Sequence, residues 1–190
     1  MKFFIVGMHS SGKEEIINYL SKNINIGIGK VFSNAPSTPD IYRCNHQEYD
    51  NKDIMEIFDN NAYLFIDNIC EYEDEYYEGL SLYEYENNEV FALTPNEIMQ
   101  IPVIDKSVCI VWLDNTLVWR QSYYKDHRRN YDFTSRERIE QQNQADLIDQ
   151  LYSTSHLIYF NNEEPMRIAV ILETILKYPD MLKKFEKYFK

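Results

Sequence analysis

The sequence predicts an α/β fold of three layers, in which helices cover both faces of a mainly parallel sheet. Two runs of consecutive apolar residues, at 3–6 and 108–112, are typical of central strands that are buried on both faces. Apolar residues also recur at helical spacing, first at Ile16, Ile17 and Leu20. Strands that alternate with helices form βαβ units, and such units build parallel sheets.

The first half of the chain predicts a strand, a glycine turn, a helix and a less regular region. The helix begins near Gly12, and a short strand near residues 30–34 leads into a loop that Pro36 and Pro39 keep irregular. The acidic, tyrosine-rich segment 70–89 alternates in part, which favours a hairpin over a helix. Between these regions, the sequence predicts a helix at 53–61 and a strand at 62–69.

The second half predicts three further strands and the helices that follow them. A strand that begins at Val90 ends at Thr94, which is the expected N-cap of a helix with Pro95 as its first residue. The remaining predicted elements are a strand within 107–115, helices at about 116–129 and 135–152, a strand at 156–160, a helix at about 164–177 and an amphipathic segment at 179–190.

Length and composition predict one domain over residues 1–190 and restrict its partners. A net charge of −12 argues against bulk nucleic-acid binding, because phosphate would be repelled outside a local basic patch. Cys44, Cys70 and Cys109 form no CxxC pair, which indicates reduced thiols in a cytoplasmic protein. The first apolar run is too short for a signal peptide or a membrane span, so no membrane association is expected.

The segment GMHSSGK, residues 7–13, has the spacing of a loop that binds phosphate. It lies between a predicted strand and a predicted helix, which is the context that such a loop requires. Backbone N–H groups from Gly7 to Gly12 would point at phosphate oxygens, and Lys13 would contact the β and γ phosphates. The alternative is a tight glycine turn with Lys13 in solvent.

Three side chains of this segment, and that of Glu14 directly after it, each have two possible roles. His9, Ser10 and Ser11 are candidates for hydrogen bonds to phosphate, with capping of the loop backbone as the alternative. Glu14 stands where Ser or Thr usually lends a hydroxyl to Mg²⁺. Its carboxylate is a candidate metal ligand, but it also brings negative charge close to a triphosphate.

Positive charge is concentrated in one segment of this acidic chain. Guanidinium groups on a lid stabilise the charge of a transferred phosphoryl group, so the segment predicts a lid. The alternative is a solvated helix face whose cations pair with nearby Asp and Glu. The basic residues are Arg120, Lys125, Arg128, Arg129, Arg136 and Arg138.

These features resemble the guanylate kinase family of P-loop nucleoside monophosphate kinases. The opening GMHSSGKEEI and residues 108–139, with their strand, helix and arginine-bearing segment, are similar to the family's loop and lid. Residues 48–66 and 156–175 are similar to the start of its monophosphate-binding subdomain and to its closing strand and helix. The resemblance implies a P-loop kinase fold with a small acceptor-binding insert at about 33–90 and a helical lid at about 120–138.

The resemblance also implies roles for individual residues. On the donor side, these are Lys13 on the phosphates, Arg120 with Arg128 or Arg129 on the transferred group, and Asn161 or Asn162 near the base. On the acceptor side, they are Ser33 and Arg43, with Tyr77 or Tyr83 on the acceptor phosphate.

The sequence departs from the family's pattern at both metal-binding positions. Glu14 replaces the hydroxyl, and Thr94 and Asn96 stand where an acidic residue that organises the metal is expected. Gln141 and Gln142 also replace an expected lid arginine, and the acceptor region lacks the family's Thr-Thr-Arg run.

The leading hypothesis is therefore a kinase that transfers the γ-phosphoryl group of ATP to a nucleoside or deoxynucleoside monophosphate with Mg²⁺. One alternative is a catalytically degenerate module that binds a nucleotide or a protein. The other is a P-loop kinase acting on a modified base in DNA, which the charge of −12 disfavours.

The acidic segment 70–89 also has two possible roles. A carboxylate at 71–75 could accept N–H bonds from a guanine-like base. Alternatively, the segment is a solvated surface or faces a partner, for which another protein or a second copy of the chain is a candidate. The abundance of Asn, Tyr, Ile and Glu over Ala and Gly is typical of an AT-rich genome, such as that of a bacterial virus or its host.

Overall fold

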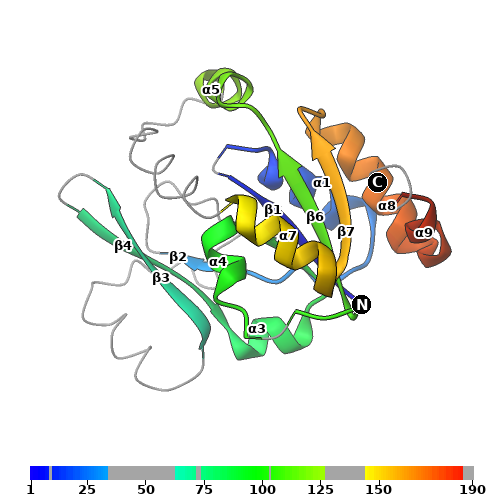
Figure 1. The fold of residues 1–190 in the computed structure, drawn as a ribbon, viewed down its shortest axis with the longest axis horizontal. Helices are drawn as coiled ribbons and strands as arrows, with labels where there is room; N and C mark the ends of the chain where they lie inside the picture. The colour runs from blue at the N-terminus through cyan, green and yellow to red at the C-terminus, as the bar shows by residue number, and fades with distance from the viewer. Residues whose placement is uncertain (9, 34–62, 72–73, 103, 127–143, 186–190) are drawn as a thin grey trace.

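The computed structural model describes residues 1–8, 10–33, 63–71, 74–102, 104–126 and 144–185, with a four-stranded sheet at its centre. All neighbouring strands of this sheet pair in parallel, so the predicted α/β fold with a mainly parallel sheet is confirmed (Figure 1). The strands, in the order in which they lie side by side, are β5 (Val90–Leu93), β1 (Lys2–Gly7), β6 (Val108–Asp114) and β7 (His156–Asn161).

Side chains of the central strands alternate between the two faces of the sheet, because successive residues of a strand point to opposite sides. Phe3 and Ile5 of β1 enter one hydrophobic core, whereas Phe4 and Val6 enter a second core on the other face. Both cores are closed to solvent, with relative exposures of 7% or less for these four residues. Burial on both faces explains why the strands read as continuous apolar runs.

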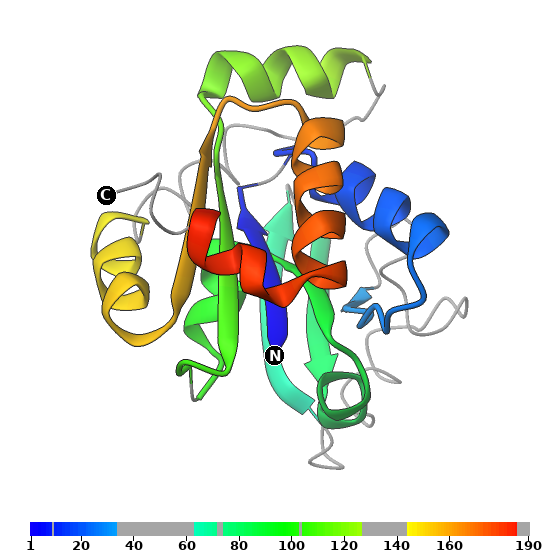
Figure 2. The same ribbon diagram turned by 90° about the vertical axis from the view of Figure 1, so that its right-hand side faces the viewer.

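Two long helices and the C-terminal turns cover the first face of the sheet (Figure 2). The apolar positions at helical spacing, Ile16, Ile17 and Leu20, are fully buried there. Burial of each such side chain contributes about 1.5–3 kcal/mol. The covering elements are α1 (Lys13–Asn23), α8 (Pro165–Lys177), the 3-10 helix η2 (Pro179–Met181) and α9 (Leu182–Phe185).

Helices and a second sheet cover the other face (Figure 1). Leu80 of the second sheet is fully buried in the same core as Ile98 and Trp112, so this sheet is packed onto the central one. Its strands, in spatial order, are β2 (Phe32–Ser33), β4 (Asp74–Ser81) and β3 (Tyr63–Glu71), and the helices of this face are α4 (Pro95–Met99) and α7 (Gln144–Thr154).

The acidic, tyrosine-rich segment forms a hairpin as predicted, but with different limits. Strands β3 and β4 are antiparallel, with Tyr63 opposite Ser81 and Glu71 opposite Asp74. The expected continuation of the hairpin toward residue 89 is wrong, because the chain enters helix α3 (Leu82–Asn87). Ser81 caps this helix, since its hydroxyl accepts the N–H of Glu84 at 3.1 Å.

Helix α4 begins where the sequence predicted. Thr94 is its N-cap and Pro95 is its first residue. Oγ1 of Thr94 accepts the N–H of Glu97 at 3.2 Å, and Oε2 of Glu97 accepts the N–H of Thr94 at 2.5 Å. This reciprocal capping box turns the Glu97 side chain back toward the end of β5.

The other predicted elements agree with the structure where it describes them. The predicted helices at about 116–129 and 135–152 are represented by α5 (Leu117–Asp126) and α7, and that at 164–177 by α8. The predicted helix at 53–61 lies outside the described residues. No helix in the described part of the chain has the length and apolar character needed to cross a bilayer.

Replacement of Gly29 by alanine is expected to destabilise the protein, because a Cβ there would lie 2.0 Å from Cε1 of Phe91. Phe91 is fully buried and packs edge-on against Phe4, with 5.6 Å between ring centroids, so its ring cannot move without disturbing the core. We expect the free energy of unfolding, measured in urea, to fall by about 1–3 kcal/mol. Ser21→Ala, on the exposed side of α1, is the control and should change it by less than about 0.5 kcal/mol. Equal stabilities of Gly29→Ala and the control would contradict the packing described here.

Candidate phosphate-binding site

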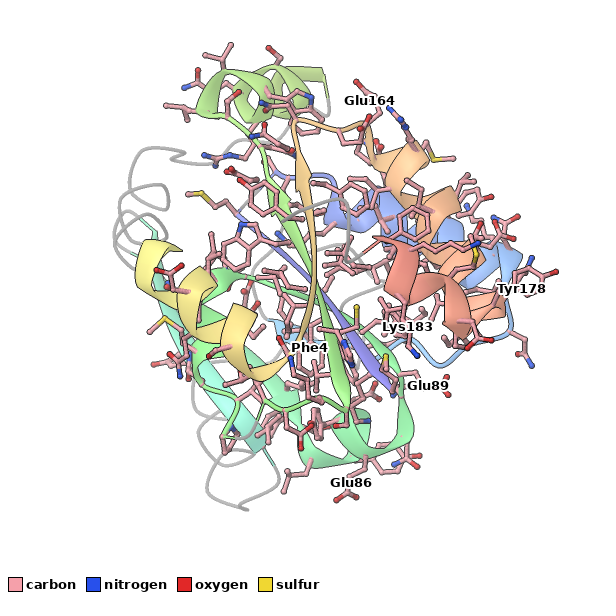
Figure 3. All side chains as sticks on the ribbon, turned by 45° about the vertical axis from the view of Figure 1, so that its right-hand side comes forward. Phe4, Glu86, Glu89, Glu164, Tyr178 and Lys183 are labelled. Carbon is pink, nitrogen blue, oxygen red and sulfur yellow. The ribbon has the colours of Figure 1, made fainter. Side chains whose placement is uncertain are left out.

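The candidate site lies at the carboxyl ends of the parallel strands, where β1 turns into α1. Helix α5 runs across this same end of the sheet (Figure 2). Figure 3 shows Glu164, the residue before α8, at this end of the molecule and Glu86 at the opposite end. Ligands of open α/β sheets usually bind outside the carboxyl ends of the strands.

The loop depends on residues with a positive φ angle. Ser10 has a φ of 59°, and Gly12, the N-cap of α1, has a φ of 87°. A side chain is strained at such an angle, and a Cβ at Gly12 would also lie 2.3 Å from Cγ of Pro165. A Cβ at Gly7 would lie 2.5 Å from Oγ of Ser11. Both glycines of the motif are therefore required by the close packing of the loop.

Lys13 reaches back over the loop that precedes it. Its Nζ donates to the carbonyl oxygens of Gly7 at 2.6 Å and Met8 at 2.9 Å, and to Oγ of Ser11 at 3.4 Å. The ammonium group is thus held at the loop by oxygen atoms, although a fully solvated lysine was the alternative expectation. These oxygens carry no formal charge, so a phosphate group would be a stronger partner for the same ammonium.

A buried carboxyl group lies within electrostatic reach of Lys13. Glu97 of α4 is 3% exposed, and its pKa is raised to about 8 by burial and, next, by the negative charge of Glu78 on β4. Hydrogen bonds with Thr94 and the positive charge of Lys13 oppose this rise of the pKa. At neutral pH the Glu97 carboxyl therefore holds a proton for most of the time.

Asn115, directly after β6, connects the loop to α5. Its Nδ2 donates to the carbonyl oxygen of Ser11 at 2.9 Å, and its own carbonyl oxygen accepts Nε–H of Arg120 at 3.0 Å. Asn115 is 5% exposed and Arg120 is 2% exposed. The structure thus brings Arg120, one of the predicted catalytic residues, to the loop region but buries its side chain.

The ends of β6 and β7 carry a second polar group of residues. The hydroxyl of Tyr159 donates to Oδ2 of Asp114, and burial followed by this hydrogen bond raises the pKa of the phenol. Asn161 lies opposite Asp114 in the sheet, and Oδ1 of Asn162 accepts the N–H of Thr116 at 2.8 Å. Asn161 and Asn162, which were predicted to lie near the base of the donor nucleotide, are therefore at the same end of the sheet as the loop.

The other predicted site residues are in different parts of the chain. Glu14 lies in the first turn of α1, and Tyr77 lies half-buried on β4. Ser33 is in β2, where its backbone pairs with Glu78. Tyr83 is 71% exposed on α3, which precedes β5 and lies at the opposite end of the sheet from the loop (Figure 1). The predicted residues that lie outside the described part of the chain are His9, Arg43, Arg128 and Arg129.

Sequence reasoning missed two residues of this site, Glu97 and Asn115. A signal for Glu97 was present, because Thr94 followed three residues later by Glu is the capping-box pattern, which directs the carboxyl back to the strand end. No comparable signal exists for Asn115, because its two partners, Ser11 and Arg120, come close only in the folded chain.

Comparisons with known proteins support the fold and go no further. No protein-family model matches the sequence, and no curated protein matches it either. The structure is similar to the crystal structure of guanylate kinase from Anaplasma phagocytophilum, with a TM-score of 0.50 and 13% sequence identity. The match covers 95% of this chain and 86% of that chain. The chain therefore has a guanylate kinase-like fold, in agreement with the resemblance found in the sequence.

Glu97→Gln is expected to change how stability depends on pH. Because the pKa of Glu97 rises from 4.5 to about 8 on folding, the folded chain keeps a proton that the unfolded chain releases. The resulting stabilisation is complete below about pH 4.5 and is lost as the pH rises through about 8. Glutamine retains the acceptor oxygen of the capping box without the charge.

Urea denaturation between pH 5 and pH 9 measures this effect. The free energy of unfolding of Glu97→Gln should exceed that of the wild type at pH 9, and the difference should shrink toward pH 5. Glu86→Gln, at an exposed position at the opposite end of the molecule, is the control and should follow the wild type. A difference between Glu97→Gln and the wild type that is the same at every pH would contradict the assignment of a buried, protonated carboxyl.

Proposed function

We propose that the protein is a nucleotide kinase that transfers the γ-phosphoryl group of ATP to a nucleoside or deoxynucleoside monophosphate. The main support is the position of Lys13, whose ammonium is held by oxygens of a glycine loop at the end of the central strand. Loop N–H groups, a helix N-terminus and a lysine together suit a phosphate group. The guanylate kinase-like fold is the second support.

In the proposed mechanism, the chain binds and orients phosphate groups and forms no covalent intermediate. Lys13 exchanges the oxygens of Gly7 and Met8 for oxygens of the β and γ phosphates. Arg120, with Arg128 or Arg129, is proposed to stabilise the negative charge on the transferred group. Asn161 or Asn162, at the end of β7, is proposed to lie beside the base of ATP.

The carboxyl groups near the loop fit a magnesium ion. Mg²⁺ is usually held by one or two carboxylates together with phosphate oxygens and water. Glu14 follows Lys13 directly, and the Glu97 carboxyl lies within electrostatic reach of both Lys13 and Glu78. The described residues contain no group of three or more His, Cys, Asp or Glu that could hold a metal. Phosphate would therefore supply further ligands, and bound Mg²⁺ would neutralise phosphate charge.

The second sheet is the proposed acceptor side of the site. Tyr77 and Glu78 are neighbours on β4, and Ser33 of β2 pairs with Glu78. The negative charge of Glu78 acts on Glu97, so this part of the sheet approaches the loop from the side of α4. Two of the four predicted acceptor residues, Ser33 and Tyr77, are therefore neighbours of Glu78 in this sheet, which supports the proposal.

A nucleotide-binding module without turnover is the second candidate function. Two observations favour it: Glu14 replaces the hydroxyl that binds Mg²⁺, and Arg120 is almost completely buried and bonded to a backbone carbonyl. Both features are compatible with binding of a nucleotide and unfavourable for transfer of its phosphoryl group.

Mass spectrometry of nucleotides tests the kinase directly. We expect Mg-ATP and a pool of ribo- and deoxyribonucleoside monophosphates, including modified pyrimidines, to yield a diphosphate product. Lys13→Ala should lower the rate by about 100-fold or more, because a charged contact to the transferred group is lost. Lys22→Ala, at the exposed C-terminal end of the same helix, is the matched control and should keep the wild-type rate.

The outcomes separate the candidate functions. A product that disappears in Lys13→Ala identifies both the activity and the acceptor. ATP binding without any product from the whole pool would refute the kinase and support the module without turnover. In a parallel assay with a DNA oligonucleotide as acceptor, transfer to the oligonucleotide and not to a mononucleotide would support the kinase that acts on DNA.

Glu14→Thr is expected to strengthen the use of Mg-ATP. The substitution removes a negative charge beside the phosphate site and restores a neutral hydroxyl for Mg²⁺. We expect KM for Mg-ATP to fall by about fivefold or more, which corresponds to about 1 kcal/mol. Glu15→Thr, one residue further along the helix, is the control. A higher KM in Glu14→Thr would instead indicate that the Glu14 carboxylate is itself the metal ligand.

A further inference from the structure

We infer that Asn115 is a positioning residue that couples the phosphate loop to α5, so that nucleotide binding at the loop is transmitted to this helix. The inference rests on the proposed function. It assigns a role to a residue for which neither the sequence motif nor the fold provides one, and it gives Arg120 a structural role in addition to the one proposed above.

The loop side of the coupling is a buried hydrogen bond between Asn115 and Ser11. Nδ2 of Asn115 donates to the carbonyl oxygen of Ser11 at 2.9 Å, and Ser11 is 1% exposed. Ser11 is also joined to the lysine, because its Oγ accepts from Nζ of Lys13 at 3.4 Å. Any change of the loop that moves Ser11 therefore acts on Asn115.

A second buried hydrogen bond, to the backbone carbonyl of Asn115, connects this residue to α5. The carbonyl oxygen of Asn115 accepts Nε–H of Arg120 at 3.0 Å, and the backbone N–H of Arg120 donates to the carbonyl oxygen of Thr116, the residue before α5. Arg120 is thus fixed at both its backbone and its side chain. Displacement of Asn115 would move α5 through this side chain.

The orientation of the Asn115 amide leaves its oxygen atom in an environment that is unfavourable for stability. Its Oδ1 is buried and has no hydrogen-bond partner among the described residues. A buried acceptor without a partner is rare in folded proteins. Flipping the amide, so that Oδ1 and Nδ2 exchange places, is unfavourable because Oδ1 would then face the carbonyl oxygen of Ser11. The side chain is therefore oriented by its donor bond to the loop, which supports a role in holding Ser11.

A second contact shows that α5 has an anchor that does not involve the loop. The N–H of Thr116, directly before α5, donates to Oδ1 of Asn162 at 2.8 Å. This bond connects the start of α5 to the end of β7. Loss of the Asn115 amide is therefore expected to uncouple α5 from the loop without unfolding the helix.

Hydrogen exchange of the full chain tests the coupling, with Mg-ATP as the probe. In the wild type, saturating Mg-ATP should slow exchange in residues 7–13 and also in α5. In Asn115→Asp, which keeps the shape of the side chain but lacks its donor, Mg-ATP should still protect the loop but not α5. The Kd for Mg-ATP should rise by about tenfold, the cost of one buried hydrogen bond. Asn88→Asp, which removes an amide donor from the end of α3, is the control and should behave as the wild type.

Arg120→Lys tests the same pair of hydrogen bonds from the side of α5. Lysine has no Nε–H at this position, so the bond to the carbonyl oxygen of Asn115 is lost and the loop should exchange faster even without nucleotide. Equal loop exchange in Arg120→Lys and the wild type, or protection of α5 by Mg-ATP in Asn115→Asp, would overturn the coupling. If the wild type binds no nucleotide, the proposed function fails, and Arg120→Lys still decides the coupling. Arg120→Lys also decides it if Asn115→Asp does not fold.

Discussion

The candidate site depends on the position of β1 between β5 and β6. Strand β1 pairs with β6 along its whole length and with β5 from Phe3 to Val6, so the loop that follows starts from a rigid point. Helix α1 must then bury Ile16, Ile17 and Leu20 against the same sheet. The chain has only a few residues in which to reverse direction, which explains the positive φ angles at Ser10 and Gly12. A loop held in this way presents its N–H groups in a preformed arrangement.

Electrostatics at the site differ from those of the molecule as a whole. The chain carries a net charge of −12, and the Glu97 carboxyl, on which the charge of Glu78 also acts, lies near the loop lysine. Glu97 tolerates this position because burial and the neighbouring carboxyl keep it protonated. Its capping-box bond to Thr94 holds it there for a structural reason. Lys13 therefore meets a neutral Glu97 at neutral pH and keeps its positive charge available for an anion.

The sequence predicted those parts of the structure that arise from local patterns. Apolar runs located the strands, helical spacing located α1 and α8, and glycine spacing located the loop. The start of α3 was missed, because the alternation that continues through Leu82 outweighed the capping signal of Ser81. The contact of Asn115 with Ser11 could not be predicted, because it joins residues 104 positions apart in the chain. Likewise, nothing in the arginine-rich segment distinguished the buried Arg120 from its neighbours.

The likeness to a guanylate kinase at 13% identity has a physical explanation in what the loop requires. In the proposed function, backbone N–H groups, two glycines and one lysine create the phosphate site, and many sequences can build the strand and helix that support such a loop. Transfer of a phosphoryl group needs more, because metal ligands and arginine side chains must be placed around the phosphate. In this chain the departures fall on those side chains, at Glu14 and Asn96, whereas the backbone-determined features are retained. Such a fold can preserve nucleotide binding under sequence change more easily than turnover, so the proposed kinase activity depends on whether carboxyl groups of this chain take the place of the metal ligands expected from the resemblance.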